Sequence, residues 1–247
     1  MIHEKAFFDF IYERHAIWYR RFILRLPPPW TDDSILSTYK FCNMYRELDA
    51  CTLYLINRLN RCLTREERLL NIVFFRFFNL RGLYERLDIE RLQRVNTLEL
   101  LPKFEAMRRT GPIFNSAYII SPGRSGRPKH ETILGHLSAL NVADLLSRVD
   151  GAATPQAAHR LFMEIPCVGS FLAGEIWTDF ASVHGFRQGW TDNDFVAIGP
   201  GAKWGLELLV GRRLSSWEQQ QELKRLHILQ ATRLRDGWCD IAYMQAI

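Results

Sequence analysis

Several signatures of well-known chemistry are absent from this 247-residue chain. It contains no GxxxxGK[ST] P-loop, no GxGxxG dinucleotide fingerprint and no Gly-x-Ser-x-Gly nucleophile elbow. Its seven histidines and five cysteines show neither HxxxH nor CxxC spacing, so we expect no structural zinc. A nucleophilic serine or cysteine triad therefore has no support in the sequence.

Long apolar runs and a secretion signal are absent as well. No stretch of about 18 uncharged apolar residues is present, which excludes a membrane-spanning helix at the level of sequence. The first residues carry Glu4, Asp9 and Glu13 among their apolar side chains, which is unlike a signal peptide. With an odd number of cysteines, this pattern predicts a cytoplasmic protein with no membrane attachment.

What is present is an ordinary globular composition, with 47% hydrophobic and 24% charged residues. The net charge of +5 modestly favours an anionic partner. Apolar residues recur at three- and four-residue steps, so the predicted class is mainly α. We expect one unit over 1–247, or two helical lobes of about 1–110 and 131–247 with a basic loop at 111–130.

Turn and capping signals set the expected helix limits. The first helix should stop at the prolines of 27–29, and Thr31 should cap a second helix that runs from Asp32 to about Arg46. Thr64 and Glu67 form a capping box for a buried helix that ends near Gly82. The other helices are expected at 49–62, 98–109, 131–140, 142–149, 155–164, 170–183, 202–209, 217–234 and 238–246.

The segment Ile165-Pro-Cys-Val-Gly169 between two predicted helices resembles the helix-hairpin-helix element of DNA glycosylases. Such a turn presents backbone N–H groups to a DNA phosphate, which here would involve Gly169 and Ser170. Cys167 stands where the first glycine of that element usually lies, and a plain structural turn is the alternative. Phe171 occupies the position of the Schiff-base lysine of bifunctional glycosylases, so we expect no lyase chemistry.

Two further segments could carry chemistry. Asp192 and Asp194 lie near the place where monofunctional glycosylases keep an aspartate, and either could act as a base or stabilise positive charge. The alternative for both is an Asx-turn or a helix N-cap in a polar loop. Gly199, Gly201 and Lys203 open a helix in a way that suits an anion, although the pattern has low specificity.

Polar residues also cluster in the first third of the chain. Either they form buried salt bridges that hold helices in register, or they line a pocket for a flipped base and a phosphate-bearing group. These residues are Glu13, Arg14, Arg20, Arg21, Arg25, Asn43, Tyr45, Arg46, Glu47, Asp49, Arg58, Asn60, Arg76, Asn79 and Arg81.

Taken together, several motifs resemble one family. They are Phe-x-x-Phe-x-x-Glu-Arg at 7–14, Pro-Pro-Trp-Thr-x-Asp-x-Ile-Leu at 28–36, Phe-Cys-Asn-Met-Tyr-Arg-Glu-Leu-Asp at 41–49, Asn-Ser-Ala-Tyr-Ile-Ile at 115–120, the hairpin at 166–169, Asp-x-Asp at 192–194 and Gly-Pro-Gly at 199–201. This set is similar to the α-glutamyl/putrescinyl thymine pyrophosphorylases, the amino acid:DNA transferases of bacteriophages. That family is related to the helical domain of some 5-hydroxymethyluracil DNA kinases.

The resemblance implies a helix-hairpin-helix DNA glycosylase-like fold and a role in thymidine hypermodification. The implied substrate is double-stranded DNA carrying 5-pyrophosphoryloxymethyluracil, made in the host cytoplasm by a 5-hydroxymethyluracil DNA kinase as pathway partner. The amine of an amino acid or polyamine displaces the pyrophosphate. No cofactor is implied; Mg²⁺ could accompany pyrophosphate, but no acidic cluster demands it.

Site roles are assigned on the same basis. Asp192, Asp194 and Glu13 are the carboxylate candidates for the incoming amine, and Arg14, Arg21 and Arg46 are the candidates for pyrophosphate. The expected base contacts are Asn43, Tyr118, Trp30 and Asp49. The expected DNA contacts are Gly169, Ser170, Gly199, Gly201, Lys203, Arg124, Arg127 and Lys129. Two alternatives stay open: a glycosylase-like hydrolase of a modified thymine, and a non-catalytic DNA-binding module that works beside a kinase.

Overall fold

A computed structural model describes residues 4–116, 118, 120, 126–184, 189–190 and 194–233. Over these residues the chain forms helices and no strand, which confirms the predicted mainly α class. The chain divides into two compact units, one of Met1–Asp49 with Ile198–Ile247 and one of Ala50–Ala197. This division differs from the expected lobes 1–110 and 131–247.

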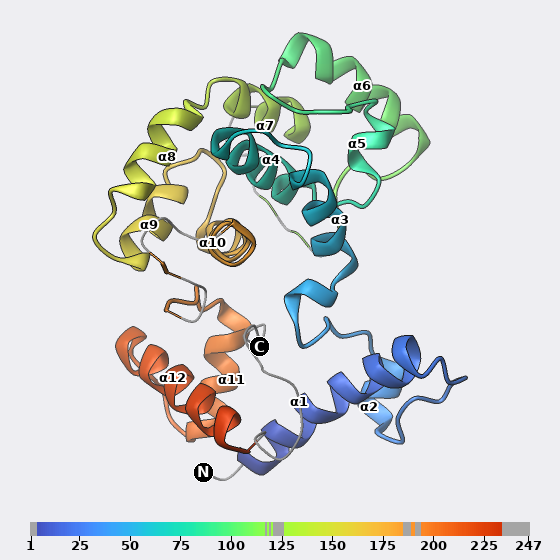
Figure 1. Ribbon diagram of the computed structural model, residues 1–247, viewed down its shortest axis with the longest axis vertical. Helices are drawn as coiled ribbons and strands as arrows, with labels where there is room; N and C mark the ends of the chain where they lie inside the picture. Colours follow the sequence, from blue (N-terminus) through green and yellow to red (C-terminus); the bar gives the residue numbers. More distant parts are fainter. Residues whose placement is uncertain are drawn as a thin grey trace. The chain divides into compact units, whose positions relative to one another are not determined.

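The first unit joins the beginning and the end of the chain. Its elements are α1 (Glu4–Trp18), the π-helical turn η1 (Tyr19–Ile23), α2 (Ser34–Thr38), the 3₁₀ turn η2 (Arg46–Leu48), α11 (Pro200–Val210) and α12 (Ser216–Arg233). Its small core consists of Leu206, Leu209, Leu214 and Leu226, with Phe7 and Phe8 of α1 packed against them. Figure 1 shows α11 and α12 as neighbouring orange and red helices, and they are in contact.

The second helix of the chain is much shorter than predicted. Instead of running from Asp32 to Arg46 it covers only α2, and its cap is Asp33 rather than Thr31. The Asp33 carboxylate accepts hydrogen bonds from the backbone N–H of Ile35 and Leu36 at 2.8 and 2.9 Å. The hydroxyl of Thr38 donates to the Ser34 carbonyl at 2.7 Å. Such side-chain bonds compete with the helical pattern, and the backbone turns extended at the next residue.

The second unit holds the main core. Its helices are α3 (Ala50–Leu59), α4 (Arg65–Phe78), α5 (Leu83–Arg86), α6 (Thr97–Thr110), α7 (Lys129–Ser138), α8 (Val142–Asp150), α9 (Pro155–Phe162) and α10 (Ser170–His184). Helix α4 is central, because it contacts α3, α8 and α10, and α6 packs on α7 (Figure 1). Its aromatic side chains Phe74, Phe75, Phe77 and Phe78 are fully buried. None of the described helices is both long and apolar enough to span a lipid bilayer.

The start of α4 was predicted correctly and its end was not. The Thr64 hydroxyl accepts from the Glu67 backbone N–H at 3.2 Å, and the Glu67 carboxylate accepts from the Leu63 N–H at 2.9 Å. The helix ends at Asn79, which has a left-handed backbone (φ 47°), rather than at Gly82. Asparagine tolerates this conformation better than most residues, so the helix needs no glycine to stop.

Candidate functional site

A buried ion pair joins the two central helices of the second unit. Arg76 of α4 is 2% exposed and Asp179 of α10 is 0% exposed. The Arg76 Nε lies 2.5 Å from Asp179 Oδ2, and its Nη2 lies 2.9 Å from Oδ1, so the two side chains pair at two points. Geometry of this kind compensates the large cost of taking both charges out of water.

Further polar groups surround the same guanidinium. Its Nη1 donates to Asn79 Oδ1 at 3.1 Å and to the Tyr118 hydroxyl at 3.2 Å, and its Nη2 donates to the Thr52 hydroxyl at 3.2 Å. The Tyr118 hydroxyl in turn donates to Glu175 Oε2 at 2.5 Å, which lies 3.4 Å from the Arg76 Nη1. We call these five residues, together with Asp179, the Arg76 network.

The acidic groups of the Arg76 network stabilise the positive charge of Arg76. Burial by itself would lower the pKa of Arg76, but the acidic groups of Asp179, Tyr118 and Glu175 outweigh burial and hold that pKa well above its usual range. The guanidinium is therefore permanently charged. The Glu175 side chain is 19% exposed, so this carboxylate keeps some access to solvent while Asp179 has none.

The predicted hairpin lies directly next to this network. Helices α9 and α10 are joined by a short turn, and Cys167 in it has a left-handed backbone (φ 67°), the conformation that favours glycine. Ser170 begins α10 and is exposed, and its carbonyl lies 3.2 Å from His159 Nε2 of α9. Burial lowers the pKa of His159, although the hydrogen bond to Ser170 opposes this, so the ring is neutral and donates.

An aromatic pair connects the hairpin to the network. Phe171 follows Ser170 on α10 and is 50% exposed. Its ring meets the Tyr118 ring edge to face, with centroids 5.2 Å apart. Tyr118 thus links an exposed aromatic surface to the partly exposed Glu175 carboxylate and the buried Arg76 guanidinium. This arrangement could hold a planar base beside a proton acceptor.

The candidates from the N-terminal helix lie in the first unit and bind one another. The Glu13 carboxylate accepts from Arg20 Nη1 at 2.7 Å, and the same nitrogen donates to the Trp30 carbonyl at 2.6 Å. The Trp30 indole N–H donates to the Leu26 carbonyl at 2.8 Å. Arg21 is exposed, with its guanidinium 4.8 Å from the centre of the Trp30 ring.

The remaining candidates of that unit are held by local contacts. Arg14 donates to the Cys42 carbonyl, and burial lowers its pKa. The Asn43 amide donates to Asp49 Oδ1 at 3.0 Å and to the Leu48 carbonyl at 2.9 Å. Arg46 is buried in η2. These contacts correspond to the interpretation in which the polar residues hold the fold in register.

The loop and helix-start candidates are placed as follows. Arg127 is exposed and lies 3.4 Å from Glu131, while Lys129 begins α7 with its ammonium 4.2 Å from the centre of the Phe114 ring. Gly199 caps α11, and Gly201 and Lys203 are exposed in its first turns. Asp194 is exposed in a turn of the second unit. Arg124 and Asp192, like the predicted helix 238–246, fall outside the described residues.

Comparison with known proteins identifies the family. Residues 2–237 match a family model described as "5-hmdU DNA kinase, helical domain". This chain belongs to that family. It is 29% identical over 229 residues to a protein of Bacillus phage SP10 named "5-hmdU DNA kinase", a match that covers 81% of this chain and 35% of the phage protein. The chain thus spans about a third of the length of that relative. No solved structure matches it.

Two acidic members of the Arg76 network, Glu175 and Asp179, are not among the site residues predicted from the sequence. A signal was available: Arg76 is the only charge in the run Val73–Phe78, and Asp179 interrupts an equally apolar run in α10. Isolated charges on buried helices must find opposite charges. Glu175 and Asp179 are also four residues apart, which places both on one face of α10.

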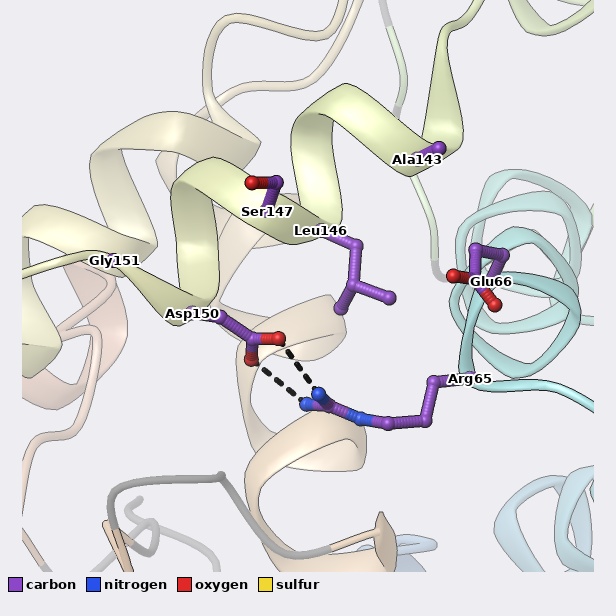
Figure 2. A pocket seen from close by; sticks show the side chains of 7 residues that line it. All are labelled: Arg65, Glu66, Ala143, Leu146, Ser147, Asp150 and Gly151. Carbon is purple, nitrogen blue, oxygen red and sulfur yellow. Dashed lines mark hydrogen bonds and ion pairs between the residues drawn. The ribbon is translucent and has the colours of Figure 1, made fainter.

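A separate cavity of about 510 Å³ lies between α4 and α8 (Figure 2). Arg65 and Asp150 form its floor and pair through two hydrogen bonds of 2.7 and 2.8 Å. This pairing neutralises Arg65 and Asp150, so Glu66 is the one lining charge outside the pair. It also offsets the unfavourable placement of an arginine at a helix start and an aspartate at a helix end. Among the described residues, no group of three or more His, Cys, Asp or Glu side chains is arranged to hold a metal ion.

Proposed function

We propose that this chain is a transferase of the DNA thymine-hypermodification pathway, which replaces the pyrophosphate of 5-pyrophosphoryloxymethyluracil in double-stranded DNA with an amine. The observation that carries the proposal is the match of residues 2–237 to the helical domain of 5-hmdU DNA kinases, in a chain that has no P-loop of its own. The resemblance of its motifs to the thymine pyrophosphorylases supports the finer assignment.

The reaction is a displacement at the exocyclic methylene carbon. A bond from the amine nitrogen to that carbon forms, the bond from the carbon to the pyrophosphate oxygen breaks, and the ammonium proton passes to a base. An active site for this reaction needs a carboxylate near the nitrogen and cations near the leaving pyrophosphate. The base must also leave the DNA stack to be reached.

The Arg76 network offers groups for the first half of this chemistry. Glu175 is a partly exposed carboxylate beside a hydroxyl, which suits the acceptance of a proton from the amine. Phe171 and Tyr118 offer ring faces and edges for the uracil. Arg76 remains charged at any pH used for assay and places a positive charge 3.4 Å from Glu175 Oε2.

The residues predicted from the sequence remain part of the proposal. Arg14, Arg21 and Arg46 are proposed for pyrophosphate, and Asp192 or Asp194 for the amine. The exposed start of α10 at Ser170 and the start of α11 at Gly199–Lys203 are proposed for DNA phosphates. The amino acid or polyamine, the kinase as pathway partner, and any Mg²⁺ that accompanies the pyrophosphate belong to the same proposal.

The test is mass spectrometry of nucleosides from DNA that carries the pyrophosphorylated base, after incubation with this protein and a mixture of amino acids and polyamines. A new thymidine whose added mass equals one amine would support the transferase and name its substrate. Abasic sites would instead identify a glycosylase-like hydrolase. An intact pyrophosphorylated base without abasic sites would contradict both activities and favour a DNA-binding module that assists a kinase.

A further inference from the structure

The end of the first helix forms an unusual surface in the first unit. From residue 14 to residue 31 the sequence contains four arginines and no aspartate or glutamate. Apart from Arg20, the residues of the π-helical turn η1 and those that follow it as far as Pro29 are exposed. They include large apolar side chains: Tyr19 39%, Phe22 53%, Ile23 52%, Leu24 49% and Leu26 47%. We call residues 19–30 the arginine–aromatic segment.

Hydrogen bonds of Arg20 and Trp30 hold the arginine–aromatic segment in its conformation. Arg20 binds both Glu13 and the Trp30 carbonyl, and the Trp30 indole binds the Leu26 carbonyl, so the ends of the segment are tied together. The Arg21 guanidinium carbon lies 4.9 Å from the centre of the Phe22 ring and 4.8 Å from the centre of the Trp30 ring. A guanidinium that is already held between two rings loses little further conformational entropy when a ligand binds next to it.

Only one of the three arginines in the arginine–aromatic segment has a carboxylate partner among the described residues. Arg20 has a carboxylate partner in Glu13. Arg21 and Arg25 are exposed and form no ion pair with any described carboxylate. An exposed surface that alternates apolar rings with unpaired arginines matches the two needs of unpaired DNA, namely π-faces for the bases and cations for the phosphates.

We propose that the arginine–aromatic segment is a contact surface for unpaired DNA bases. Phe22, supported by the Arg21 guanidinium, stacks on a base, and Arg25 binds a neighbouring phosphate. The inference rests on the DNA substrate of the proposed function and does not require the amine transfer, since it concerns binding alone. Its probe is therefore DNA without any modified base.

The experiment measures fluorescence anisotropy of a labelled single-stranded oligonucleotide of about twenty nucleotides with the full chain. We expect Phe22→Ala to weaken binding about tenfold, because loss of one stacked base has that effect. Arg25→Gln should lower the slope of log affinity against log salt by about one. Trp217→Ala removes a ring that is more exposed than Phe22 (70% against 53%) from α12 of the same unit, and it should change neither quantity.

Two results would overturn the inference. One is binding by Phe22→Ala and Arg25→Gln that equals wild type, with circular dichroism confirming that all variants are folded. The other is tighter binding to vesicles of phosphatidylglycerol than to DNA, lost in the same variants, which would make the segment a membrane contact. If DNA binds through this segment and no amine is transferred, the proposed function fails and the inference stands. If amine is transferred but the segment variants bind DNA as wild type does, the inference fails and the proposed function stands.

Discussion

Replacement of Asp179 by asparagine tests the physical account of the Arg76 network. The substitution keeps the shape of the side chain and removes the charge that lies 2.5 Å from Arg76 Nε. Arg76 stays charged and 2% exposed, so it loses its nearest counter-charge in a site that water hardly reaches. Breaking a buried pair on one side costs about 3–5 kcal/mol. Because Glu175 remains 3.4 Å away, we expect the lower end, about 3 kcal/mol.

The assay is urea unfolding followed by circular dichroism, with thermal melting as a second readout. A loss of about 3 kcal/mol corresponds to a fall of about 6–12 °C in the melting temperature for a chain of this length. Asp150→Asn is the matched control, since it removes the partner of Arg65, whose side chain is 38% exposed, and should cost about 1 kcal/mol or less. Equal losses in the two variants would refute the reasoning.

Three smaller predictions concern the hairpin and the packing around it. Cys167→Gly should raise the free energy of unfolding by about 0.5–1 kcal/mol, because the residue has a φ of 67°, and an unchanged urea midpoint would contradict the strain. Gly174→Ala should cost about 1–3 kcal/mol, because the new Cβ would lie 2.6 Å from Ala197 Cβ, whereas Gly135→Ala on α7 meets nothing within 4 Å and should stabilise by about 0.5–1 kcal/mol. Burial lowers the pKa of His159 below its unfolded value of about 6.5, so the native state binds fewer protons than the unfolded chain as the pH falls through that value. The free energy of unfolding should therefore decrease as the pH drops through this range. A His159→Gln variant should lose less over that window in urea titrations at fixed pH, and parallel curves would contradict the assignment.

Most helices of the second unit were predicted from local signals in the sequence, although the end of α4 and the short α5 were not. The capping pair Thr64 and Glu67 and the apolar periodicity around them were sufficient to predict the start of α4 and its burial. Where the prediction was wrong, as for α2, the decisive bonds came from short polar side chains that terminate a helix early. Propensity alone does not reveal which of these side chains will bind the backbone.

The candidate site was harder to predict than the fold. Tyr118 was predicted as a base contact, and its partner Glu175 lies 57 residues further along the chain, so no local pattern connects them. The Arg76–Asp179 pair spans 103 residues. A lone charge in an apolar helix shows that a partner must exist, but only the packing of α4 on α10 identifies it. In the first unit, Glu13 pairs with Arg20 and Asn43 with Asp49, which is one of the two arrangements that the sequence left open.

The most direct test of the central claim is amine-dependent release of pyrophosphate. DNA carrying 5-pyrophosphoryloxymethyluracil is incubated with the protein with and without the amine found by mass spectrometry, and pyrophosphate and modified nucleoside are both counted. The account predicts one pyrophosphate for each amine added, and a loss of at least about a hundredfold in rate for Glu175→Gln, with Glu164→Gln as an exposed control on the same unit. Pyrophosphate release without amine incorporation, or no release at all, would contradict the proposed transferase.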